Sequence, residues 1–205
     1  MCHVQYNLKY STKDRILGLE IDVLPHEYVA NLSENKHMML LYDDPEYARE
    51  IETIFIAKGL QKGECCIYVS HDGYSFETSA LGQFGIDGKR CIRDGTLHIV
   101  NSEDFADRAN SKSALEKLLC VPTAKVRMVG RWIPDVGTVK GIASELELEK
   151  DVHSHFDEFP GSILCTYKID NICKTDHAGW TIKIMNNHHS VMLLTGERKG
   201  TVHEF

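Results

Sequence analysis

Polar and aromatic residues follow several apolar stretches of the chain, where an α/β protein usually binds its ligands. The candidates for a ligand pocket are Tyr42, Asp43, His71, Asp72, Arg131, Trp132 and Tyr167. Pockets for small molecules are mostly aromatic-lined with a few polar groups, so Trp132 is expected to form a flat wall. A tyrosine at a strand end can equally bury its ring in the core and keep its hydroxyl wet. We therefore expect a small-molecule pocket without catalytic residues.

The chain lacks the loop that binds phosphate in nucleotide hydrolases. Such a loop needs glycines whose backbone N–H groups face the phosphate, a lysine, and a hydroxyl for magnesium. The first apolar stretch runs instead into Tyr42-Asp43-Asp44-Pro45-Glu46, whose acids would repel a triphosphate. The fourth runs into Gly130-Arg131-Trp132, without an acid for magnesium. We predict a protein that is not an enzyme, with a divergent nucleotide-binding protein or ATPase as the alternative.

Other cofactor and metal motifs are also missing. No G-x-G-x-x-G follows a strand and no G-x-S-x-G is present, which argues against dinucleotide binding and a hydrolase triad. His153 and His155 are two apart on an expected helix and diverge, as do the adjacent His188 and His189. Cys165 lies inside an expected strand, where a cysteine usually acts as a small buried hydrophobe. The prediction is no metal and no cofactor.

Apolar strands alternate with helices from residue 37 onward. Strands are expected at 37–42, 65–70, 97–100, 125–130, 163–167 and 191–194, with a last strand at 201–205 antiparallel at the sheet edge. Helices are expected at about 45–58, 76–84, 111–120, 139–155 and 176–187. Asp44 would cap the first of these helices, and Gly59 would end it in the left-handed conformation. This alternation predicts a three-layer α/β fold, with a mostly parallel sheet and helices on both faces. Ligands then bind beyond the C-terminal ends of the strands.

Composition and charge narrow the class of protein. The 205 residues are 42% hydrophobic and 26% charged, which suits one folded domain at 36–205 after a weakly patterned N-terminal extension at 1–35. The net charge of −7 argues against direct nucleic-acid binding, and we interpret the short basic run Lys89-Arg90-x-x-Arg93 as solvated surface. No apolar run or leader pattern indicates a membrane span or secretion. Seven scattered cysteines suit a reduced state in the cytoplasm.

A series of short motifs resembles, in order, the MEDS sensory domain (methanogen, methylotroph and DcmR-type). The motifs are His37-x4-Tyr42, Gly59-Leu60-x-x-Gly63-Glu64, Arg127-x-x-Gly130-x-Trp132, Glu147 on the following helix, Leu164-Cys165-x-Tyr167, and His188 followed by Val191-Met192. The resemblance spans roughly residues 35 to 196. One departure is His189, which stands where the family has proline.

The resemblance implies a RecA-like or KaiC-like frame that has lost its Walker A phosphate loop. Members of the family are thought to sense small hydrocarbon-like metabolites and are often attached to DNA-binding or signalling modules. No helix-turn-helix pattern is recognisable in residues 1–35, which puts a direct transcriptional role in doubt. The expected partners are a small-molecule ligand and a regulatory protein. A homo-oligomeric interaction module without a ligand remains a further alternative.

Overall fold

The computed structural model describes residues 23–70, 76–101, 125–131, 138–173 and 178–205. Seven strands form one sheet in the order β3-β2-β4-β5-β1-β6-β7. All neighbours pair in parallel except β6 and β7, which are antiparallel at one edge. The strands are β1 His37–Tyr42, β2 Cys65–Ser70, β3 Leu97–Asn101, β4 Val126–Arg131, β5 Gly161–Lys168, β6 Ser190–Thr195 and β7 Lys199–Glu204. The predicted three-layer, mostly parallel architecture is confirmed.

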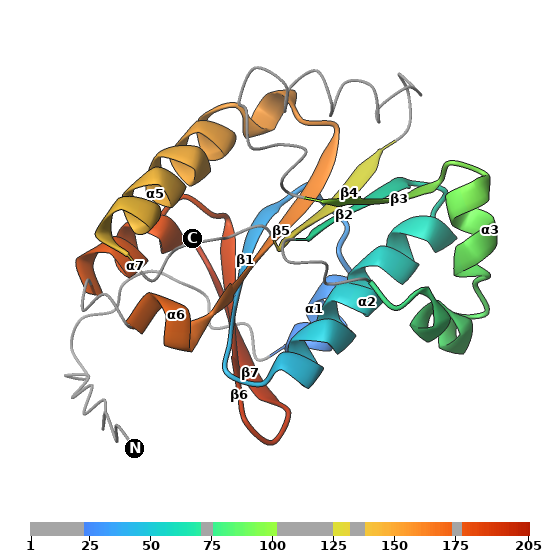
Figure 1. The fold of residues 1–205 in the computed structure, drawn as a ribbon, viewed down its shortest axis with the longest axis horizontal. Helices are drawn as coiled ribbons and strands as arrows, with labels where there is room; N and C mark the ends of the chain where they lie inside the picture. Colours follow the sequence, from blue (N-terminus) through green and yellow to red (C-terminus); the bar gives the residue numbers. More distant parts are fainter. Residues whose placement is uncertain (1–22, 71–75, 102–124, 132–137, 174–177) are drawn as a thin grey trace.

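Helices cover both faces of the sheet (Figure 1). One face carries α1 Pro25–Ala30, α2 Pro45–Gln61, the 3-10 helix η1 Thr78–Phe84 and α3 Gly88–Arg93. The other carries α5 Val139–Ser154, the 3-10 helix η3 Phe156–Glu158, α6 Ile169–Cys173 and α7 Ala178–Met185. Two cores result, because side chains alternate along each strand. Leu40 packs with Ile51 and Phe55 of α2, whereas Met39 packs with Ile142 of α5 and Ile184 of α7.

Helix α2 begins as predicted and ends later than predicted. Asp44 caps it, accepting hydrogen bonds from the backbone of Glu46 and Tyr47. The expectation that Gly59 ends the helix is wrong, since the helix continues to Gln61 and Gly63 takes the left-handed conformation, with φ 74°. Gly59 is required for packing: a Cβ there would lie 2.6 Å from the Cδ atom of Arg127. The sequence does not distinguish a glycine that ends a helix from one that leaves room for a neighbouring side chain.

Helix α5 turns two acids toward the sheet. Thr138 caps its first turn by accepting a hydrogen bond from the backbone of Gly141 at 3.1 Å. Ile142, Glu145 and Glu149 recur at helical spacing and are buried, whereas Glu147 is exposed. A stripe at positions three and four apart faces the core of a helix-covered sheet. The helix therefore delivers carboxylates into a dry interior, where they need polar partners.

Some predicted elements differ from the observed ones. The segment expected to be helical at 76–84 forms η1, and α3 and α6 were not predicted. The helix expected at 111–120 lies outside the described residues. Helix α1, within the predicted N-terminal extension, packs against α2 and β7. None of the helices in the described ranges is long and apolar enough to cross a membrane.

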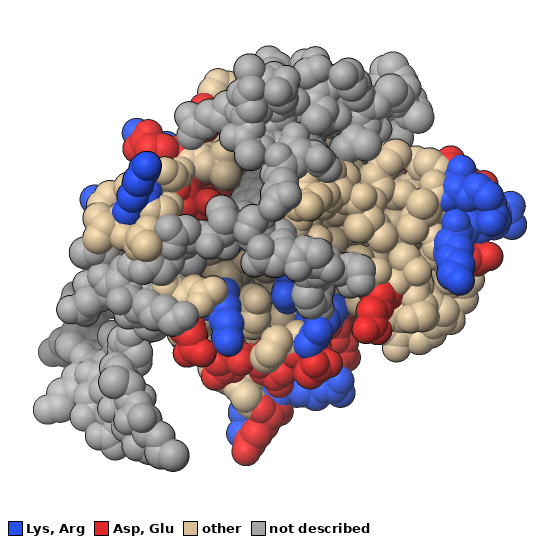
Figure 2. All heavy atoms as spheres, viewed as in Figure 1, with Lys and Arg blue, Asp and Glu red and all other residues tan. Residues whose placement is uncertain are grey.

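The basic run of α3 lies on the surface, as predicted. Lys89, Arg90 and Arg93 are exposed, and Arg90 forms an ion pair with Asp94 four residues later. Figure 2 shows this basic group at the edge of the molecule with acidic atoms beside it. A mixed surface of this kind is solvated and offers no continuous track for a nucleic-acid backbone.

Candidate functional site

The C-terminal ends of β1 and β4 carry a compact polar group on the α2 face. The Nε atom of Arg131 donates to Oε1 of Glu52 at 2.9 Å, and the Tyr68 hydroxyl donates to Oε2 at 2.8 Å. The guanidinium also lies over the ring of Tyr42, 5.1 Å from its centroid. Burial alone lowers the pKa of Arg131, but the Glu52 carboxylate outweighs it and raises that pKa. Arg131 is therefore a permanent charge held against a buried acid.

The turn from β1 into α2 occupies its own backbone donors. The amide of Asp43 donates to the Leu194 carbonyl at 3.2 Å, and Pro45 has no N–H. Asp44 accepts from Glu46 at 3.0 Å and from Tyr47 at 3.1 Å. Figure 2 shows acidic side chains gathered over the start of this helix. The positive end of a helix usually attracts an anion, and here a side chain of the protein takes that position.

The predicted pocket residues do not all share one face. Tyr42 is buried beneath Arg131 on the α2 side, and Asp43 is exposed beside them. Tyr167 is buried on the opposite face of the sheet, among the side chains beneath α5. His71, Asp72 and Trp132 lie outside the described residues. The structure thus brings Tyr42 and Arg131 together and separates both from Tyr167.

A cavity of about 430 Å³ lies at the other end of the sheet, near the starts of β2, β4 and β5. Arg127 lines it and forms an ion pair with Glu64. Nη1 of Arg127 also donates to the Phe55 carbonyl at 3.1 Å. Glu147 lies apart from Arg127 and Arg131, because α5 covers the opposite face of the sheet and turns Glu147 to solvent.

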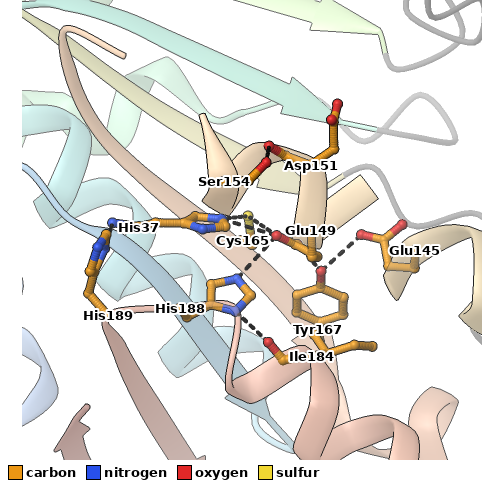
Figure 3. Close-up of polar contacts among 10 residues, drawn as sticks. All are labelled: His37, Glu145, Glu149, Asp151, Ser154, Cys165, Tyr167, Ile184, His188 and His189. Atoms are coloured by element: carbon orange, nitrogen blue, oxygen red, sulfur yellow. Dashed lines mark hydrogen bonds and ion pairs between the residues drawn. The ribbon is translucent and has the colours of Figure 1, made fainter. Parts of the chain in front are cut away.

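Beneath α5, four side chains that bind metals elsewhere meet in the interior (Figure 3). They are His37 at the start of β1, Glu149 on α5, Cys165 in β5 and His188 just before β6. Their ligand atoms all lie within 4.8 Å of one another. Nε2 of His37 is 3.0 Å from Oε2 of Glu149, and Nε2 of His188 is 3.3 Å from the same oxygen. We call these four residues the His–Glu–Cys cluster.

A second set of contacts orients the cluster. Nδ1 of His188 donates to the Ile184 carbonyl at 2.8 Å, and the Tyr167 hydroxyl contacts the carboxylates of both Glu149 and Glu145. Because a carbonyl only accepts, the proton of a neutral His188 ring sits on Nδ1. Its Nε2 atom, which then carries the lone pair, faces Glu149, as the dashed line in Figure 3 marks. The same pattern orients histidines that bind metals.

Burial and polar contacts shift the pKa values of three cluster residues, His37, Cys165 and Glu149. Burial lowers the pKa of His37, which favours the neutral ring, and raises the pKa of the Cys165 thiol well above its usual range. Burial by itself also raises the pKa of Glu149. The charge of His188 and polar contacts from His188 and His37 outweigh it and hold that pKa well below its usual range. An ionised carboxylate inside a protein is costly unless it is paired or binds a metal.

Three of these residues stand out in the sequence, but nothing there joins them. His37 and His188 belong to the family-like motifs, Cys165 is expected to be a small buried hydrophobe, and His188 is expected to diverge from His189. His188 and His189 do diverge: Nδ1 of His189 accepts from the backbone of His37, whereas His188 enters the cluster. The position of β1 between β5 and β6 places the three segments side by side, and no spacing in the sequence indicates it.

Two solved structures from Pyrococcus horikoshii share the fold. A KaiC-like protein from strain OT3 has a TM-score of 0.55 at 17% identity, covering 83% of this chain and 77% of that one. An uncharacterised protein, solved in complex with an unknown peptide, has a TM-score of 0.59 at 11% identity and covers 83% of each chain. A search among curated proteins found no match. The profile of the MEDS domain, the methanogen/methylotroph, DcmR sensory domain, matches residues 36–178. The chain therefore belongs to the MEDS sensory-domain family.

Proposed function

We propose that this chain is a non-catalytic domain that senses a small molecule or relays a signal on a RecA-like frame whose phosphate site has been lost. Its ligand would bind at the C-terminal ends of the strands, near Tyr42, Arg131 and Trp132. The fold places α2 directly after β1, where a phosphate-binding helix begins in a RecA-like ATPase. Whether the start of α2 can still bind a phosphate therefore distinguishes a sensory domain from an ATPase.

The observation that carries the proposal is the capping of α2 by Asp44. The amides of Glu46 and Tyr47, which could have faced a phosphate, donate to the Asp44 carboxylate instead. The amide of Ala48 donates to the Asp44 carbonyl at 3.1 Å, and Pro45 contributes no donor. An anionic ligand would have to displace an anionic side chain from the positive end of the helix.

The acids around this turn support the same conclusion. Asp43 and Glu46 are exposed beside Asp44, and like charges disfavour the approach of a triphosphate. Membership of a sensory-domain family and the KaiC-like neighbours agree with a frame of this kind put to signalling use. A divergent nucleotide-binding protein is the alternative, and it would have to bind ATP at another place.

A thermal-shift comparison tests the proposal. The purified chain is melted with ATP and magnesium, and separately with a panel of short-chain alcohols, aldehydes and related small metabolites. A true ligand at 100 times its Kd should raise Tm by roughly 5–10 °C for a chain of this size. We expect no shift and no phosphate release with ATP and magnesium, and a shift with at least one member of the panel.

The chain offers a matched control in its two tryptophans. Trp132→Ala should abolish the shift caused by a panel ligand, whereas Trp180→Ala, in α7 on the face of the sheet opposite Tyr42, should retain it. Strong stabilisation by ATP with magnesium, together with no response to any metabolite, would refute the proposal. A sedimentation mass above that of one chain, together with no thermal shift from any ligand, would favour the interaction-module alternative.

A further inference from the structure

We propose that the His–Glu–Cys cluster is a binding site for one divalent transition metal ion of the zinc class. Nε2 of His37, Nε2 of His188, Sγ of Cys165 and Oε2 of Glu149 would be its ligands. The site is independent of the proposed sensing function and lies on the other face of the sheet from Tyr42 and Arg131.

The distances within the cluster suit a tetrahedral ion. Ligand atoms at ~2.0–2.3 Å from a tetrahedral zinc lie roughly 3.3–3.7 Å apart. Oε2 of Glu149 is 3.0 Å from Nε2 of His37, 3.3 Å from Nε2 of His188 and 3.7 Å from Sγ of Cys165. Sγ of Cys165 is 3.4 Å from Nε2 of His37. The remaining pairs of ligand atoms lie within 4.8 Å, so side-chain shifts of up to about 1 Å would complete the coordination sphere.

The donor atoms are prepared for a cation. The bond from His188 to the Ile184 carbonyl leaves Nε2 of the neutral ring with a lone pair, and this buried nitrogen faces Oε2 of Glu149 at 3.3 Å without a well-formed hydrogen bond. Tyr167 holds the second carboxylate oxygen of Glu149. A buried lone pair facing a fixed carboxylate is costly in a protein interior, and a metal ion would satisfy both groups.

Charge and burial identify the class of ion. A Glu149 carboxylate and a Cys165 thiolate carry two negative charges, which a divalent cation neutralises. Two imidazoles, a thiolate and a carboxylate are ligands of zinc and related transition metals, and differ from the all-oxygen sets of magnesium and calcium. The His37, Glu149 and His188 side chains are at most 1% exposed. Four protein ligands in a closed site are typical of structural metal centres rather than catalytic ones.

Metal analysis of the full chain is the direct test. After reconstitution with zinc and removal of free metal, we expect one equivalent of zinc per chain. Titration with cobalt(II) should reach the same stoichiometry and give visible bands of a tetrahedral ion, with a near-ultraviolet thiolate-to-cobalt band. A folded chain, checked by circular dichroism, that retains no zinc and shows no cobalt spectrum would overturn the proposal and leave a metal-free hydrogen-bond network.

Two cysteines provide a matched pair of variants. Cys165→Ser should remove the thiolate band and lower zinc affinity at least tenfold. Cys66→Ser, at an equally buried cysteine on the α2 face, should keep the thiolate band and the zinc affinity of the unmodified chain. Tyr167→Phe keeps all four ligands and should weaken zinc binding roughly 10–100-fold, the usual effect of removing an outer hydrogen bond. The same cobalt spectrum in Cys165→Ser as in the unmodified chain would contradict the assigned ligands.

Discussion

The Glu52 carboxylate on α2 binds the Arg131 guanidinium at the end of β4, with Oε1 and Nε 2.9 Å apart. Glu52 is 1% exposed and Arg131 14%, so neither charge can regain full hydration if the other is removed. Tyr68 donates to the second oxygen of Glu52, which fixes the carboxylate in place. This group joins α2 to the sheet at the C-terminal end of β4.

Glu52→Gln should destabilise the protein strongly, because it leaves the Arg131 charge buried without its counter-charge. We expect a loss of about 3 kcal/mol in the free energy of unfolding, near the low end for a broken buried pair. Urea unfolding followed by circular dichroism measures it. Glu50→Gln is the matched control on the same helix: its partner Arg198 is 70% exposed, and such surface pairs contribute about 0–1 kcal/mol. Equal effects of the two substitutions would show that burial of the Glu52 pair does not matter.

Asp44→Ala removes the cap of α2 and should lower the free energy of unfolding by about 1 kcal/mol. Thermal and urea unfolding both measure this loss. Asp43→Ala, at the exposed neighbouring acid, should change it by less than about 0.5 kcal/mol. ATP with magnesium should still give no thermal shift in Asp44→Ala, since neither a lysine nor a glycine loop is restored. Binding of ATP by this variant would show that the cap alone blocks the phosphate site.

Gly59→Ala should destabilise the protein although alanine is the better helix former. The new Cβ would lie 2.6 Å from Cδ of Arg127 and 2.7 Å from Sγ of Cys66, and overpacking of this kind costs about 1–3 kcal/mol. Gly179→Ala, in α7, meets no atom within 4 Å and should stabilise the helix by about 0.5–1 kcal/mol. The two variants should therefore shift the urea midpoint in opposite directions, and stabilisation by both would contradict the close packing at Gly59.

The stability of the fold should fall in acid partly through Glu204 of β7. The hydrogen bond from Lys36 is the main reason why the pKa of Glu204 is lowered, with further help from the Tyr28 hydroxyl. A carboxylate with a lowered pKa in the folded state stabilises the protein above its unfolded pKa, and this contribution is lost as the pH falls through the folded value. Glu204→Gln should therefore flatten the acid branch of the curve of unfolding free energy against pH. Lys36→Gln should flatten it too, and an unchanged branch in Lys36→Gln would contradict the assigned cause.

The sequence was sufficient to predict the strands and the start of α2, and insufficient to predict how the side chains pack between them. Runs such as Cys65–Ser70 and Ile163–Tyr167 predict buried parallel strands because nearly every residue in them is apolar. The start of α2 at Asp44-Pro45 could also be predicted, since capping depends on adjacent residues. The packing role of Gly59 and the exposure of Glu147 could not be predicted in this way. Each depends on which side of a helix faces the sheet, and that is set by packing between distant segments.

The His–Glu–Cys cluster shows the same limit for a site. His37 and Cys165 are 128 positions apart, and a spacing of that size carries no metal signature of its own. Their proximity follows from the parallel pairing of β1 with β5, and His188 arrives through the pairing of β1 with β6. The proximity of Tyr42 and Arg131 was easier to foresee, because the ends of parallel strands meet at one edge of the sheet.

The central position of β1 has a consequence for the order of folding. Its first residue, His37, can meet Cys165 and His188 only after two long-range strand pairings have closed, and such contacts carry a large loop-closure cost. The cluster is therefore expected to be unformed in the folding transition state. Cys165→Ser and His188→Gln should accelerate unfolding while leaving the refolding rate nearly unchanged, as stopped-flow chevron plots would measure. Slower refolding in both variants would place β1 and its two neighbours in the folding nucleus, so the same polar residues would set how fast the chain folds rather than how long it stays folded.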